Sequence, residues 1–100
     1  MYLNIMFDIE YHKTRISIWF VFENNNKSSS KKIKKRYAKI EYNKFSITYG
    51  FSNKKTENWD IYNFKKINEC LNILDKFLVS KNEILLLEQK NKITEHYLLL

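Results

Sequence analysis

The sequence predicts an α+β fold, in which an antiparallel β-sheet carries one long amphipathic helix packed on one face. A chain of 100 residues, 44% hydrophobic and 16% aromatic, has room for one well-filled core and therefore one domain. Its first half alternates apolar and polar residues, as strands with one buried face do. Residues 60–80 instead repeat apolar residues at steps of three and four, the period of a helix with one buried side.

The first half of the chain predicts four strands arranged as two hairpins. Residues 2–11 and 15–23 each alternate, and the short polar segment 12–14 joins them as a turn. Alternation returns at residues 37–42 and continues at 45–51, with Asn43-Lys44 as a two-residue turn between them. One face of such an antiparallel sheet can lie under a helix while the other meets water.

The helix is predicted over residues 60–80. Asp60 is a suitable N-cap, because its carboxylate can accept a hydrogen bond from an amide of the first turn. Trp59 and Phe64 have the spacing of a hydrophobic staple around that cap, and Asn82 can take the left-handed conformation that ends a helix. The predicted buried face contains Ile61, Phe64, Ile67, Cys70, Leu71, Leu74, Phe77 and Leu78.

Residues 83–100 allow two predictions. Four consecutive apolar residues, 84–87, and the apolar-rich segment 93–100 favour two further strands at the edge of the sheet, with a turn at Lys90-Asn91. A C-terminal helix is the alternative, but the apolar run has no step of three or four. We therefore expect four strands, a helix and two more strands within one domain over residues 1–100.

Most of the excess positive charge lies in a predicted basic loop at residues 24–36. The formal net charge is +7, and this loop has six basic residues and no acidic one. A flexible basic arm can contact phosphates or an acidic protein surface, and a lysine-rich one suits diffuse attraction. The alternative is a solvated loop that keeps a strand edge from aggregating. The basic residues are Lys27, Lys31, Lys32, Lys34, Lys35 and Arg36.

A second candidate binding site is the sheet face that the helix leaves open. Alternation places Trp19 and Tyr37 on this face, among the basic side chains of Arg15 and Lys39. Exposed aromatic and basic groups on a sheet can stack on nucleobases. The same residue types are enriched in protein interfaces, which we favour, and they could also pack under C-terminal strands.

The residues offer little support for catalysis. Asp8, Glu10 and His12 share one face of the first strand and are metal-capable ligands, although alternating acids are ordinary on a wet sheet face. Cys70 is expected to be buried, and His96 has no partner identifiable by spacing. One glycine and no proline exclude glycine-rich phosphate loops. We predict no enzyme, cofactor or metal site.

These observations favour a small basic protein that binds a protein partner, without catalysis, within a nucleic-acid-handling complex. An inhibitor or modulator of the phage type, anti-CRISPR proteins included, matches the size and the single domain. The alternative function is weakly specific binding of RNA or single-stranded DNA, and the third is a small metal-dependent enzyme. Neither a secretory signal nor a membrane span is visible in the sequence, so we expect a cytoplasmic protein.

Overall fold

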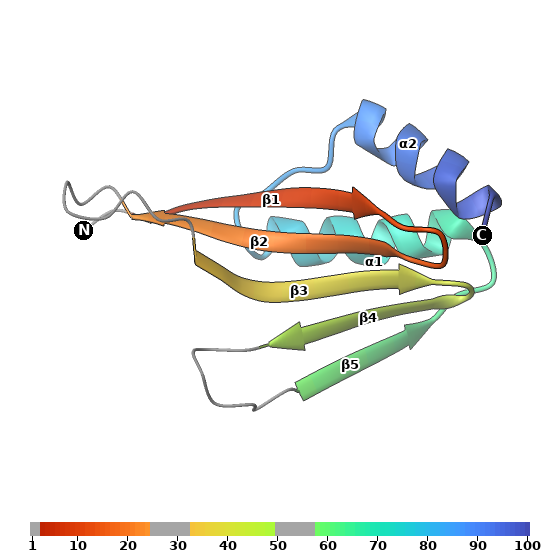
Figure 1. The fold of residues 1–100 in the computed structure, drawn as a ribbon, viewed down its shortest axis with the longest axis horizontal. Coiled ribbons are helices and arrows are strands. Elements are labelled where there is room, and N and C mark those ends of the chain that lie inside the picture. Colours follow the sequence, from red (N-terminus) through yellow and green to blue (C-terminus); the bar gives the residue numbers. More distant parts are fainter. Residues whose placement is uncertain (1–2, 25–32, 50–57) are drawn as a thin grey trace.

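The computed structural model describes residues 3–24, 33–49 and 58–100, and it confirms the α+β class (Figure 1). Five strands precede two helices along the chain. The prediction of one antiparallel sheet is therefore confirmed, whereas the predicted order of its elements is partly wrong. The elements are β1 (Leu3–Tyr11), β2 (Ile16–Asn24), β3 (Ile33–Glu41), β4 (Lys44–Tyr49), β5 (Asn58–Asn63), α1 (Ile67–Val79) and α2 (Leu87–Leu98).

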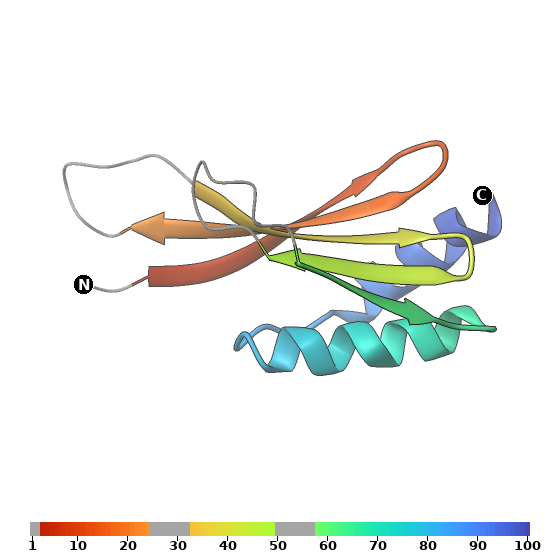
Figure 2. The same ribbon diagram turned by 90° about the horizontal axis from the view of Figure 1, so that it is seen from below.

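The sheet is an antiparallel meander in which each strand pairs with the next one along the chain, in the order β1-β2-β3-β4-β5. A register shift at Phe20/Val21 marks a bulge between β2 and β3. The β3–β4 turn consists of Tyr42 and Asn43, one residue earlier than predicted, because Glu41 pairs with Lys44. Asn43 has a positive φ of 58°, a conformation that asparagine tolerates better than most residues. Figure 2 shows the helices on one side of the sheet.

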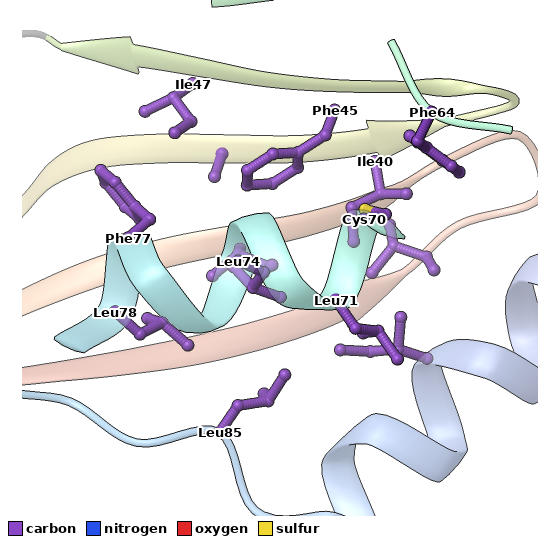
Figure 3. Packing of buried hydrophobic residues seen from close by; sticks show 14 of the residues in the cluster. Ile40, Phe45, Ile47, Phe64, Cys70, Leu71, Leu74, Phe77, Leu78 and Leu85 are labelled. Atoms are coloured by element: carbon purple, nitrogen blue, oxygen red, sulfur yellow. The ribbon is translucent and has the colours of Figure 1, made fainter. Parts of the chain in front are cut away.

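The core lies between α1 and the sheet face turned toward it. Alternate residues of β2, β3 and β4 form the floor, and the apolar face of α1 forms the roof (Figure 3). The rings of Phe20 and Phe77 meet edge to face with centroids 5.1 Å apart. Burial of each such side chain contributes about 1.5–3 kcal/mol of transfer free energy. The buried core residues are Ile16, Ile18, Phe20, Ala38, Ile40, Phe45, Ile47, Phe64, Cys70, Leu71, Leu74, Phe77, Leu78, Leu85 and Ile93.

The predicted start of the first helix is wrong by seven residues. Residues 58–63 form β5, and α1 begins at Ile67. Asp60 is therefore not an N-cap, and Trp59 and Phe64 do not form a staple. The N-cap is Lys66, which makes no side-chain cap hydrogen bond, and the carboxylate of Glu69 accepts a hydrogen bond from the amide of the preceding residue, Lys65, at 2.9 Å. The buried face from Cys70 to Leu78 is confirmed, and Asn82 has the predicted left-handed conformation, with φ 60°.

The prediction of two C-terminal strands is wrong, since residues 87–98 form the helix α2. Of the apolar run, Leu85 enters the core whereas Ile84, Leu86 and Leu87 are exposed. The side-chain Oε1 of Gln89 accepts a hydrogen bond from the Leu86 amide at 2.9 Å, which satisfies a backbone donor at the helix start.

Helix α2 packs across the ends of two hairpins. Ile93 is buried in the core, and the Tyr97 hydroxyl donates a hydrogen bond to Oδ1 of Asn43 at 3.1 Å. The His96 ring is hydrogen-bonded through Nε2 to the backbone carbonyl of His12. The C-terminal half of α2 thus lies against the turns at residues 12–15 and 42–43.

The predicted basic loop is too long at its C-terminal end. Lys34, Lys35 and Arg36 belong to β3, and the strand pattern starts at Ile33. In the register with β2, Arg36 lies opposite Phe20 and Lys34 opposite Val21, so Lys35 is the extra residue of the bulge. Lys27, Lys31 and Lys32 lie outside the described residues.

Candidate binding surface

The sheet face turned away from α1 and α2, called here the outer face, carries a row of paired residues that crosses the five described strands and includes three aromatic side chains. The register pairs Asp8 with Trp19, Trp19 with Tyr37, Tyr37 with Thr48 and Thr48 with Trp59. Side chains opposite each other on antiparallel strands lie about 4.5–5.5 Å apart at Cβ, so neighbours in this row touch. Three aromatic rings therefore stand side by side on a face that no described helix covers (Figure 2).

The three rings support one another and are held by polar contacts. The Trp19 and Tyr37 rings have centroids 4.5 Å apart at an angle of 57°, and Trp59 meets Tyr37 edge to face at 6.4 Å. The Tyr37 hydroxyl and Ser17 Oγ lie 2.8 Å apart, and Ser17 Oγ also accepts a hydrogen bond from Nε of Arg15 at 3.4 Å. These contacts fix the orientation of Tyr37 and place a guanidinium beside it.

Lys39 connects the aromatic row to the charged part of the outer face. Its Nζ lies 4.6 Å from the centre of the Trp59 ring, which is a cation–π distance, and 3.4 Å from Oε1 of Glu41. The described charged side chains on this face are balanced. Three are basic (Arg15, Lys39 and Lys44) and three are acidic (Asp8, Glu10 and Glu41).

Two apolar side chains of β5 extend the outer face to the sheet edge. Trp59 is 37% exposed and Ile61 is 61% exposed. Thr48, between Tyr37 and Trp59, is buried, and its hydroxyl has no hydrogen-bond partner among the described residues. A partner that covered this face would find exposed apolar area at Trp59 and Ile61.

The structure brings four of the predicted binding residues together. Arg15, Trp19, Tyr37 and Lys39 lie on the outer face of β2 and β3. Trp19 packs on Tyr37, Ser17 links Arg15 to Tyr37, and Trp59 contacts both Tyr37 and Lys39. Of the remaining predicted binding residues, Lys34, Lys35 and Arg36 belong to the N-terminal part of β3, and Lys27, Lys31 and Lys32 lie outside the described residues.

Sequence reasoning missed Trp59 and Ile61 as site residues, because it placed them at the start of a helix. A signal for the correct structure was present. Trp59 and Ile61 alternate with Asp60 and Tyr62, and aromatic and β-branched residues favour strands. The helical period of the following segment, extended backwards through Ile61 and Phe64, concealed this alternation.

The residues considered for catalysis do not form a cluster in the described part of the chain. His12 Nε2 lies 3.7 Å from Oε2 of Glu10, and no group of three or more His, Cys, Asp or Glu side chains there is placed to hold a metal ion. Cys70 is fully buried, and burial raises the pKa of its thiol to about 12. A thiol with such a pKa is a poor nucleophile at neutral pH.

A groove opens on the opposite side of β5, between the sheet and α1. It has a volume of about 340 Å³ and is lined by Ile47, Tyr62, Ile73, Lys76 and Phe77. In Figure 1, α1 runs behind the first strands, and β4 and β5 extend beyond it. Ile47 and Phe77 lie at the end of the core nearest this groove (Figure 3).

Comparison of the chain with family models, with curated proteins and with solved structures finds no match. Among the described helices, neither is long and apolar enough to cross a membrane.

Proposed function

We propose that this chain is a non-enzymatic binding protein whose outer face docks on a protein partner within a nucleic-acid-handling complex, where it acts as an inhibitor or modulator. The row Trp19–Tyr37–Trp59 is the observation that carries this proposal. Tryptophan, tyrosine and arginine dominate the binding energy of protein interfaces. Here they form one rigid surface, so little side-chain entropy is lost when a partner covers it.

Among the side chains that the structure describes, the balance of charge on the outer face favours a protein partner over a polyanion. A surface that binds a nucleic acid strand neutralises successive phosphates with lysine and arginine. On the described outer face, the acidic residues Asp8, Glu10 and Glu41 equal the basic ones in number. The rings also pack against one another edge to face or tilted, so their flat surfaces are partly occupied.

The class of partner is inferred from the charge of the whole chain. The net charge of +7 comes almost entirely from residues 24–36 of the sequence. A basic segment of this kind attracts an acidic protein surface, or the guide or target strand that a partner holds. Such a chain would dock through the outer face and be steered to its partner by the basic segment.

The proposal is tested by photo-crosslinking in host cells from an unnatural amino acid at position 6. Met6 is an exposed residue of the outer face, and position 92 on α2 serves as the control. We expect one cross-linked protein from position 6 only, unaffected by nuclease. With that protein purified, Trp59→Ala should weaken binding at least about 30-fold, the effect of a hot-spot residue. Equal cross-linking from both positions, or unchanged affinity of the variant, would contradict the proposal.

Direct binding of single-stranded RNA or DNA is the second candidate function. The observation that favours it is the pairing of the partly exposed Trp59 ring with the Lys39 ammonium, since aromatic and cationic groups together bind stacked bases. Titration with oligo(U) and oligo(dT) distinguishes the two functions. Saturable quenching of tryptophan fluorescence that weakens with salt would favour this candidate, whereas docking on a protein predicts no such quenching.

A further inference from the structure

We propose that the free edge of β5, together with the groove beneath it, receives an extended segment of the partner as an additional strand of the sheet. The segment would carry an apolar side chain that enters the groove and an acidic side chain that reaches Lys76. This inference rests on the proposed function, since it names how part of the partner is held. Pairing at a sheet edge gives affinity through main-chain hydrogen bonds and specificity through pockets for alternate side chains.

The direction of the backbone groups of β5 follows from one hydrogen bond. The Phe64 amide donates to the carbonyl of Asn43 at 3.2 Å, and these residues continue the register that pairs Asn63 with Lys44. In an antiparallel ladder, hydrogen-bonded pairs alternate with non-bonded pairs. The even-numbered residues of β5 therefore bond to β4, and the odd-numbered ones turn their N–H and C=O groups away from it.

The outward groups of Ile61 and Asn63 are available for a further strand. Strand β5 is the last in the sheet order and pairs only with β4 among the described strands. Natural edge strands are commonly protected by lysine, proline or a bulge. Lysine, proline and a register shift with β4 are absent from β5, whose sequence NWDIYN has a single charged residue, Asp60, on the core-facing side opposite Ile47.

The groove supplies the second part of the recognition. Its lining combines Ile47 and Tyr62 of the sheet with Ile73, Lys76 and Phe77 of α1, and it opens on the helix side of β5. Side chains of an added strand alternate between the two faces of a sheet. A residue paired beside Tyr62 would therefore point toward α1, where a volume of about 340 Å³ accepts an aliphatic or aromatic side chain.

Lys76 defines the charge of the segment. It lines the groove, and it forms no ion pair within the part of the chain that the structure describes. A carboxylate at the mouth of an apolar groove would pair with this ammonium under partial desolvation, which strengthens the interaction relative to a fully exposed pair. On the outer face, the neighbouring side chains of the added strand would cover Ile61 and extend the aromatic row.

The backbone part is tested with peptides and requires no variant of the protein. A displayed library of random eight-residue segments is selected against the wild-type chain, and we expect sequences with alternating apolar residues and one carboxylate. In a selected peptide, N-methylation of an amide facing β5 should weaken binding about tenfold or more, since a backbone hydrogen bond is lost and a steric block is added. N-methylation of the neighbouring amides, which face away, should have little effect. No enrichment, or equal effects at both sets of amides, would overturn the proposal.

Variants of the protein test the groove and separate this inference from the proposed function. Lys76→Glu should weaken the acidic peptide at least about tenfold, whereas the charge reversal Lys92→Glu on exposed α2 should not. Ile61→Pro removes an outward amide, and a thermal melt shows whether it stays folded. If the cross-linked partner is lost on Tyr37→Ala but retained by Ile61→Pro and Lys76→Glu, the outer face docks without strand addition, and only this inference fails.

Discussion

Asn43 combines three roles at one position. Its backbone takes a left-handed conformation, its carbonyl accepts a hydrogen bond from the Phe64 amide, and its side chain accepts one from the Tyr97 hydroxyl. The residue thus holds together the β3–β4 turn, the end of β5 and helix α2. A single short amide side chain makes this possible, because asparagine tolerates positive φ and offers an acceptor within reach.

We expect Asn43→Ala to lower the free energy of unfolding by about 1.5–3 kcal/mol, from the lost hydrogen bond and the strain of alanine at positive φ. Asn43→Gly keeps the conformation and loses only the side-chain contact, so its cost should be about 0.5–1.5 kcal/mol. Urea denaturation of both variants measures the difference. A glycine variant as unstable as the alanine variant would show that strain at positive φ does not contribute to the loss of stability in the alanine variant.

The burial of Cys70 makes the free energy of unfolding depend on pH in alkaline solution. Its thiol has a pKa of about 12 in the folded chain, against an ordinary value of 9.0, because it is buried. Above pH 9 the unfolded chain releases this proton while the folded chain retains it. Stability should therefore fall as pH rises from 9 to 12, by up to about 1.4 kcal/mol per pH unit.

The variant Cys70→Ala isolates this effect, because all tyrosine and lysine titrations remain in both proteins. Below pH 8, the unfolding free energies of wild type and variant should differ by a constant amount. Above pH 9, the unfolding free energy of the wild type should fall relative to that of the variant. Denaturant melts at half-unit pH intervals provide the measurement. Parallel stability curves up to pH 11 would mean that the thiol ionises in the folded state.

At the scale of elements, helix α1 is the main support of the sheet. Leu74 is fully buried against it, whereas Asn72 on the same helix is exposed. Leu74→Ala should lower the unfolding free energy by about 2–5 kcal/mol through lost transfer energy and a cavity. Asn72→Ala should change it by less than about 0.5 kcal/mol. Similar denaturant midpoints for the two variants would contradict the register of α1.

The elements that the sequence identified correctly are those with an unambiguous period. Residues 2–11, 15–23, 37–42 and 45–51 alternate, and Cys70, Leu71, Leu74 and Leu78 follow one helical face, so the inner and outer residues of these segments could be assigned. The bulge at Lys35 interrupts the alternation, so the first part of β3 was predicted as loop. For the same reason Arg15, Trp19, Tyr37 and Lys39 were placed correctly on one face. The binding surface was therefore about half predictable from periodicity alone.

Two of the errors arise where periods compete. Ile61 and Phe64 continue the helical spacing of α1 by chance, and only pairing with β4, a long-range contact, makes residues 58–63 a strand. The run 84–87 resembles a buried strand, yet only Leu85 is buried. Helix α2 has a single fully buried residue, Ile93, so its periodicity was too weak to read.

For the whole molecule, the proposed function predicts that the basic segment and the outer face make separable contributions to binding. Removing Lys31 and Lys32 by alanine substitution should lower the association rate with the protein partner about tenfold at low salt and change the dissociation rate by less than about threefold. The fold should be unaffected, as a thermal melt will show. Removal of Lys66 and Lys92, both exposed, is the control for net charge. Equal loss from both pairs would assign the effect to total charge.

The meander also implies an order of folding. Each strand pairs with its neighbour along the chain, whereas the contact between His12 and His96 joins positions 84 residues apart. Closing long loops costs entropy before any contact compensates for it, so the hairpins should form early and α2 should dock last. Substitutions at the α2 contacts should then accelerate unfolding and leave the refolding rate almost unchanged. In the native state, α2 should open ahead of the sheet, and its amides should exchange with solvent long before those of β2 and β3.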